Sequence, residues 1–154
     1  MKPLGINLIP RTSWYNNLRS MFSKEDWDIL RKDCYKKAGY VCEICGGRGD
    51  KWPVECHEIW DFSEWGVQKL VRLIALCPLC HKCQHPGLAQ INGEFEDCVK
   101  HYMAVNKVSE KEARKDFNEA FKVWQERNET DWELDIKNLP TPVTPLGDKS
   151  EDEK

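Results

Sequence analysis

The chain has 154 residues, of which 40% are hydrophobic and 32% are charged, and its formal net charge is −3. This length predicts one domain with appendages, and the apolar content excludes a wholly disordered chain. Its apolar stretches are far shorter than the roughly 20 residues that span a bilayer, and the N-terminal residues lack the apolar run of a secretory signal. We therefore expect a cytoplasmic protein that makes no membrane contact.

The charge is divided unevenly along the chain. Residues 1–86 carry 13 Lys and Arg against 10 Asp and Glu, whereas residues 87–154 carry 10 against 16. The first part also contains seven of the eight cysteines. This asymmetry weakly favours a phosphate-binding face in the cysteine-containing part of an otherwise acidic chain.

A helix is predicted over residues 24–38. Ser23 precedes it and has the residue type of an N-cap, while Gly39 follows it and is typical of a helix end. Leu30 and Cys34 are separated by one helical turn. We therefore expect the Cys34 side chain to lie in the core.

Two short strands and a second helix are predicted next. Residues 53–60 are partly alternating and are bounded by Pro and Asp, which favours a strand. Residues 73–76 suit a second, buried strand. Pro78 suits the first turn of a helix over residues 78–85 that stops before Pro86.

The C-terminal part predicts two longer helices. Residues 94–106 form the first, with Cys98 on its apolar stripe. Ser109 and Glu112 have the spacing of a capping box, which predicts that the second helix begins there and continues to about residue 127.

The end of the chain predicts a short extended segment and a tail. Residues 132–136 alternate between apolar and polar side chains, whereas the last residues are rich in Pro and then acidic. We therefore divide the chain into an N-terminal helical extension, a core, a C-terminal helical extension packed on that core and a disordered acidic tail, at residues 1–39, 40–87, 88–139 and 140–154.

Four of the cysteines form two C-x-x-C pairs, Cys42 with Cys45 and Cys77 with Cys80. This spacing lets two thiolates from one tight turn bind the same metal, and two such pairs complete a tetrahedral zinc site. A redox-active C-x-x-C is the alternative, which two copies disfavour. Cys83 is either a spare thiol or a substitute ligand.

Three of the four histidines lie near the second cysteine pair or in the strand before it. His81 and His85 are four residues apart, so on one helix they would share a face, and His57 comes from the predicted strand. Because the cysteine site is complete without them, these histidines predict a second, open site for a divalent metal. The alternative is that His81 and His85 only cover the cysteine site.

The order of these motifs resembles the zinc-knuckle branch of the HNH endonucleases. The resemblance covers residues 40–87 and rests on C-x-x-C, a strand with a histidine, and the string LIALCPLCH; WPVECHEIW and AFKVWQER also look like small HNH proteins of bacteria and phages. It implies a ββα-metal fold, in which two antiparallel strands and a helix hold one catalytic metal. The fold class expected is α+β, a small ββα-metal core on a four-cysteine zinc site with α-helices on both sides.

The resemblance also implies roles for the histidines. His57 matches the general base that takes a proton from the attacking water, a task that suits an imidazole. His81 matches a ligand of the catalytic metal, and His85 matches an extra histidine found one turn later in some members. The implied cofactors are a structural zinc and a divalent metal (Mg, Mn, Ni or Zn), and the implied reaction hydrolyses DNA to a 5′ phosphate and a 3′ hydroxyl.

Two positions depart from the family pattern. Arg72 stands where the family usually has Asn; arginine cannot bind a metal but can clamp a phosphate. The family also has a metal ligand directly before its general base, where this chain has Cys56 before His57. Either Cys56 replaces the ligand and His57 is the base, or His57 is the ligand and Glu58 is the base.

The expected partner is DNA, with a protein partner or a dimer to supply specificity. Four basic residues near the site are candidates for contacts with backbone phosphates: Arg48, Lys51, Lys69 and Lys82. Trp60 and Trp65 either stack on unpaired bases or seal the core. The best hypothesis is a metal-dependent HNH endonuclease that nicks or cuts DNA. The rivals are a non-catalytic zinc module and an adaptor that binds a protein partner.

Overall fold

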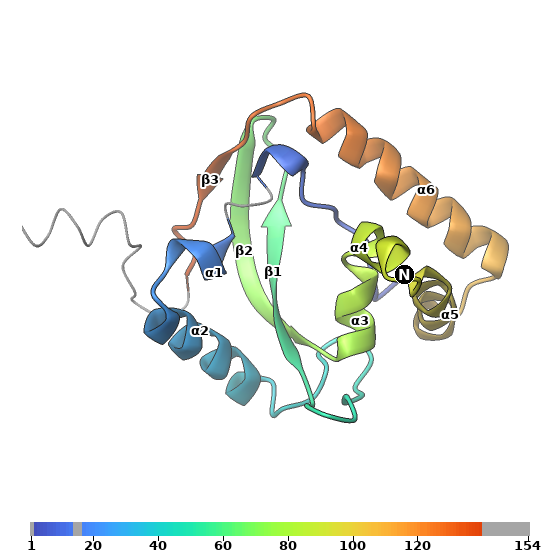
Figure 1. The fold of residues 1–154 in the computed structure, drawn as a ribbon, viewed down its shortest axis with the longest axis horizontal. Coiled ribbons are helices and arrows are strands. Elements are labelled where there is room, and N and C mark those ends of the chain that lie inside the picture. Colours follow the sequence, from blue (N-terminus) through green and yellow to red (C-terminus); the bar gives the residue numbers. More distant parts are fainter. Residues whose placement is uncertain (1, 14–16, 140–154) are drawn as a thin grey trace, which may run out of the picture.

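The computed structural model describes residues 2–13 and 17–139 and has an α+β architecture around a three-stranded sheet (Figure 1). The elements, in chain order, are η1 (Arg11–Ser13), α1 (Leu18–Met21), α2 (Lys24–Lys37), β1 (Glu55–Asp61), β2 (Val67–Leu76), α3 (Pro78–Cys83), α4 (Pro86–Ile91), α5 (Phe95–Asn106), α6 (Glu110–Arg127) and β3 (Glu133–Asp135). The tail predicted at 140–154 lies outside the described residues.

The sheet has the order β1-β2-β3. β1 and β2 form an antiparallel hairpin in which Glu55 is opposite Leu76 and Asp61 is opposite Lys69. β3 pairs in parallel with the beginning of β2. This pairing at both edges explains why β2 extends well beyond the predicted 73–76. β1 has one unpaired edge within the described residues.

Side chains of the hairpin alternate between two cores, one on each face. The α3-side core includes Ile74 and Leu76 of β2 and the helices α3, α5 and α6. The α2-side core includes Leu73 and Ala75 of β2, together with α2 and Trp132. In Figure 1, α1 and α2 accordingly lie on one side of the hairpin and α3 to α6 on the other. Because neighbouring strand residues point to opposite faces, each core receives every second residue.

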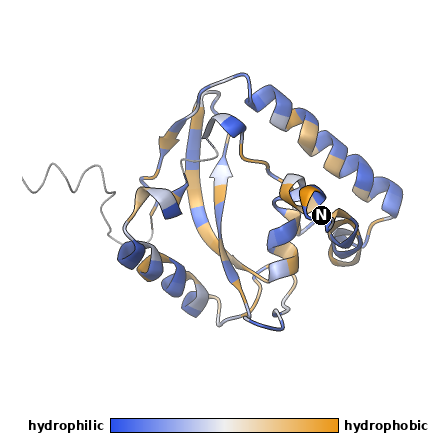
Figure 2. Cartoon of the chain, viewed as in Figure 1, coloured by the Kyte–Doolittle hydropathy of each residue, from blue (hydrophilic) through white to orange (hydrophobic). Residues whose placement is uncertain are grey.

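The observed N-caps confirm the predicted starts of α2 and α6. Ser23 caps α2 by accepting a hydrogen bond from the Asp26 N–H at 3.2 Å, and Ser109 caps α6 by accepting one from the Glu112 N–H at 3.1 Å. Cys34 and Cys98 are buried in the two cores, as their helical spacing predicts. Figure 2 shows that α2 and α6 consist mainly of hydrophilic residues. No helix among the described residues is long and apolar enough to cross a membrane.

The helix predicted over about residues 78–85 is present and stops before Pro86, as predicted, but it is shorter than expected. α3 ends at Cys83, and His85 is the N-cap of a separate helix, α4, which begins at Pro86. The cause is Pro86, whose ring disfavours the helical conformation of the residue before it; His85 has φ −127° and ψ 59°. His81 and His85 are therefore not on the same helix.

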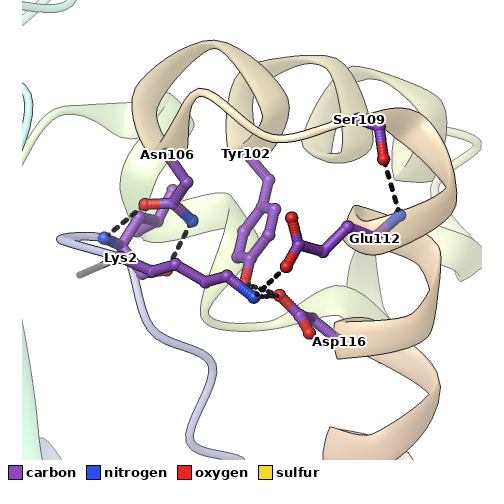
Figure 3. Close-up of polar contacts among 7 residues, drawn as sticks. Lys2, Tyr102, Asn106, Ser109, Glu112 and Asp116 are labelled. Atoms are coloured by element: carbon purple, nitrogen blue, oxygen red, sulfur yellow. Dashed lines mark hydrogen bonds and ion pairs between the residues drawn. The ribbon is translucent and has the colours of Figure 1, made fainter.

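The N-terminal segment is fastened to α5 and α6 by side chains (Figure 3). Asn106 accepts a hydrogen bond from the Leu4 N–H and donates one to the Leu4 carbonyl, both at 2.9 Å. The Lys2 ammonium lies 2.7 Å from Asp116 and 3.1 Å from Glu112. Leu4 is thereby held, fully buried, in the α3-side core.

We expect Asn106→Ala to lower the free energy of unfolding by about 2 kcal/mol, because it leaves the buried N–H and carbonyl of Leu4 without partners. Urea denaturation followed by circular dichroism measures the loss. Lys2→Ala, which removes only exposed ion pairs, should cost less than about 1 kcal/mol. Equal losses in the two variants would contradict this account of the N-terminal segment.

Candidate metal centres

Four cysteines lie close together where β2 ends and α3 begins. The Sγ atoms of Cys42, Cys45, Cys77 and Cys80 all lie within 4.8 Å of one another, and those of Cys45 and Cys77 are 3.6 Å apart. All eight cysteines of the chain are free thiols. A tetrahedral zinc with Zn–S bonds of about 2.3 Å requires sulfurs about 3.8 Å apart. The four cysteines can therefore hold a metal such as zinc, as the paired motifs predict.

Backbone amides point at these sulfurs. The N–H of Cys45 donates to the sulfur of Cys42, and the N–H of Gly47 donates to that of Cys45. Gly46, at φ 77°, makes this turn possible because the left-handed conformation is strained for other residues. A hydrogen bond from the Cys80 thiol, followed by backbone hydrogen bonds such as that from the Cys45 N–H, lowers the pKa of Cys42 to about 4 although burial opposes this shift. A thiolate is the form that binds metal.

A fourth histidine, His101, touches the cysteine cluster. Its Nε2 lies 3.1 Å from the sulfur of Cys80, across the contact between α5 and α3. This contact could not be predicted from the sequence, because the two residues are 21 positions apart and only helix packing joins them. A ring N–H directed at this sulfur would stabilise its thiolate.

Three imidazoles form a second cluster. His57 comes from β1, His81 from α3 and His85 from the start of α4, and one ring nitrogen from each lies within 4.8 Å of the others. The Nε2 atoms of His81 and His85 are 3.3 Å apart. Two imidazoles bound to one tetrahedral zinc at about 2.0–2.1 Å would have this separation. The donor set therefore fits a divalent metal, as the sequence predicts, although His85 reaches it from a different helix.

A carboxylate that the sequence analysis missed orients one of these rings. Glu55 Oε1 lies 2.9 Å from Nδ1 of His81, and Glu55 Oε2 accepts a hydrogen bond from the indole N–H of Trp52, also at 2.9 Å. This hydrogen bond at Nδ1 leaves the Nε2 of His81 directed toward the cluster. The position of Glu55 could have been predicted from the sequence, because it is two residues before His57 and the alternation of a strand puts both side chains on one face.

The histidine cluster favours neutral imidazoles. Burial, followed by the charge of His81, lowers the pKa of His85 to about 4, and burial likewise depresses the pKa of His57 well below its ordinary value. A metal binds the neutral ring. The protein environment thus keeps these nitrogens available to a metal at neutral pH.

Cys56 and Glu58 do not join the histidines. Each is adjacent to His57 in β1, so alternation turns both toward the α2 side. Glu58 accepts hydrogen bonds from the Leu18 N–H at 2.9 Å and from the Trp60 indole at 3.1 Å, and burial raises its pKa. The thiol of Cys56 pairs with that of Cys34. The expectation that Cys56 is a metal ligand is corrected accordingly.

Arg72 also lies apart from the histidines. Its guanidinium pairs with Glu43, whose other carboxylate oxygen accepts a hydrogen bond from the Ala75 N–H at 2.7 Å. These contacts draw the Arg72 side chain to a different cavity, next to α2. The structure therefore does not bring the predicted catalytic arginine to the site.

A cavity of about 300 Å³ opens beside the histidine cluster along the free edge of β1. Its lining comes from both faces of that strand and from the N-terminal segment: Ile9, Asn17, Arg19, Trp27, Cys56, His57, Glu58, His81, His85 and Leu88. The cavity leaves room beside the imidazoles for a substrate group and water.

The predicted phosphate contacts are dispersed. Arg48 and Lys51 are exposed in the loop before β1, and Lys69 lies at the opposite end of the hairpin from Glu55. Lys82 is near the histidines but pairs with Glu94. The tryptophans differ as well: Trp60 is buried and seals the α2-side core, whereas Trp65 is exposed and packs edge-on against Trp132.

Comparison with models of protein families, with curated proteins and with solved structures finds no match to this chain. The chemistry of the molecule is thus indicated by its own side chains: four thiols in one cluster, three imidazoles in a second, and a cavity beside the imidazoles.

We expect Cys42→Ala to lose the metal bound by the cysteine cluster and to unfold the surrounding core, because such sites contribute folding free energy directly. Metal content by mass spectrometry and helicity by circular dichroism measure both effects. Cys34→Ala is the matched control: it also removes a buried cysteine, but one outside the cluster. Retention of metal by Cys42→Ala would contradict the assignment.

Stability should fall as the pH falls through the ordinary pKa of histidine. His85 titrates near 4 when folded and near 6.5 when unfolded, so between these values the unfolded chain binds more protons. For this residue, with no metal on the histidines, we expect a loss of about 2 kcal/mol between pH 7 and pH 5. His85→Gln should remove that part of the pH dependence. Urea denaturation of both proteins at both pH values tests this prediction. An equal loss of unfolding free energy between pH 7 and pH 5 in the two proteins would refute it.

Proposed function

We propose that this protein is a metal-dependent endonuclease of the HNH type, with a structural zinc on its four cysteines and a divalent metal on its three histidines. The observation that carries the proposal is the histidine cluster, whose ligand atoms converge from a strand and from two short helices beside an open cavity. A purely structural metal site would have no need of a second set of ligands next to a complete first set.

The order of the elements supports this proposal. β1, β2 and α3 follow one another in the chain, and the two strands are antiparallel. The histidines come from β1, from α3 and from the start of α4. This is the arrangement that the resemblance to HNH endonucleases implies for residues 40–87. The cysteine cluster lies at the junction of β2 and α3, where it would fix the helix relative to the hairpin.

The residues have distinct roles in the proposed site. His57, His81 and His85 hold the metal, and Glu55 positions His81 through its Nδ1. A divalent metal bound there would stabilise charge on a phosphate oxygen and lower the pKa of a water molecule. The cavity beside the rings would accept the phosphate group.

Of the two roles that the sequence leaves to His57, the geometry favours that of ligand, because its ring converges with the other two at centroid distances of 5.1 and 5.5 Å. Glu58 is poorly suited to be the base, since both of its oxygens already accept hydrogen bonds. The general-base role of His57 remains a prediction of the family resemblance.

A non-catalytic zinc module is the second candidate. The observation that favours it is the scarcity of cations near the site: Lys82 is neutralised by Glu94, and Arg72 lies at a different cavity, paired with Glu43. Such a module would use the cysteine cluster alone and would leave the histidines without a metal.

We expect the zinc-loaded protein to convert supercoiled plasmid to nicked or linear forms when Mg²⁺, Mn²⁺ or Ni²⁺ is added. His57→Ala should lower the cleavage rate at least 100-fold, because it removes one of three ligands, while zinc content and circular dichroism stay unchanged. Gel electrophoresis over time measures the rate.

Arg72→Gln serves as the control, because Arg72 lies at a different cavity; its rate should stay within about threefold of the wild type. Cleavage that survives in His57→Ala would point to a contaminating nuclease. Folded, zinc-bound protein that cleaves no plasmid with any of the metals would favour the non-catalytic module.

A further inference from the structure

A second cavity adjoins the histidine cluster on its other side. It has a volume of about 400 Å³ and shares His81, His85 and Leu88 with the first cavity. We call the two together the histidine groove. The other residues that line the second cavity are Trp52, Glu55, Pro78, Lys82, Ala89, Asn92 and Glu94. A linear ligand could thus lie on both sides of the imidazoles at once.

Trp52 provides a flat apolar surface in this groove. The side chain is 52% exposed, yet its indole N–H is fixed to Glu55 Oε2, and the other oxygen of that carboxylate faces His81. One carboxylate therefore sets the position of both the indole and a proposed metal ligand. Leu88, also 52% exposed, extends the apolar surface beyond the rings.

The charge of the histidine groove does not suit a duplex. Its cations are Arg19 and Lys82, and Lys82 pairs with Glu94; the carboxylates of Glu55 and Glu58 line it as well. Non-specific binding of a duplex draws essentially all of its affinity from neutralised phosphates. Stacking of a base on an aromatic ring needs no such charge, and every base has a face that can stack.

We propose that the histidine groove binds an unpaired stretch of DNA, with one base stacked on Trp52 and the adjoining backbone passing the histidines toward Arg19. This inference rests on the proposed nuclease function, to which it adds the substrate class. Arg19 is exposed, lines the far side of the groove and makes no ion pair among the described residues, so it can contact a phosphate there.

Binding can be measured apart from cleavage. Fluorescence anisotropy with a labelled ten-nucleotide oligo(dT), without added divalent metal, gives the affinity for single-stranded DNA, and a duplex of the same length gives the comparison. We expect tighter binding of the single strand. Trp52→Ala should weaken that binding about tenfold, within the range for loss of one stacked base, and should leave duplex binding unchanged.

Two further variants separate stacking from other effects. Trp52→Phe keeps an aromatic face but loses the hydrogen bond to Glu55, so its affinity should stay within about threefold of the wild type. Trp65→Ala removes another exposed tryptophan, one outside the groove, and should have no effect. The proposal is overturned if Trp52→Phe loses as much as Trp52→Ala, if duplex binding falls equally, or if Trp52→Ala binds oligo(dT) normally.

The same oligonucleotides distinguish this inference from the nuclease proposal. Trp52-dependent binding of oligo(dT) without metal-dependent cleavage would remove the nuclease function and leave a single-strand-binding groove. Cleavage of plasmid with no dependence of binding on Trp52 would keep the nuclease and remove the stacking site. Tighter, Trp52-dependent binding of oligo(rU) than of oligo(dT) would assign the groove to RNA and overturn its assignment to DNA.

Discussion

The convergence of four thiols at the junction of β2 and α3 is the constraint on which the rest of the site depends. Cys42 and Cys45 come from the loop after α2, whereas Cys77 caps α3 and Cys80 lies within it. Cys80 is fully buried, and the next residue, His81, turns toward the hairpin. A metal on the cysteines would therefore fix the helix that carries His81, and its binding free energy would be folding free energy.

Because side chains alternate along β1, one face of the strand carries residues of the site and the other packs in a core. Glu55 and His57 face α3 and its neighbours, whereas Cys56 and Trp60 face the α2-side core. A strand with a core on each face can support a polar site on one of them without losing its hydrophobic contacts on the other. His57 thus lies on a rigid strand, and Glu55 of the same strand holds the orientation of His81.

Electrostatics limits what the histidine groove can bind. An ion pair with Glu94 occupies Lys82, which leaves Arg19 as the other cation of the groove, and the exposed surface is apolar at Trp52 and Leu88. Burial keeps His57 and His85 neutral, which prepares them for a cation and not for a phosphate. The attraction for an anionic substrate would therefore come from a bound metal and from Arg19, and the remaining affinity from stacking.

The sequence by itself determined the features that depend on local spacing. The C-x-x-C pairs placed two thiols in each turn, Ser23 and Ser109 marked the starts of α2 and α6, and the cysteines on apolar stripes were buried as expected. Capping, helical periodicity and short ligand spacings involve neighbours within about one turn, so the chain encodes them directly.

Only the tertiary structure decided which side chains meet. The helix before Pro86 ended at Cys83, so His85 reached the cluster as the N-cap of α4, and Glu43 drew Arg72 to a different cavity. The contact of His101 with Cys80 joins residues far apart in sequence. Each of these outcomes depends on the packing of distant elements or on the choice among several partners for a long side chain, and neither is encoded in local spacing.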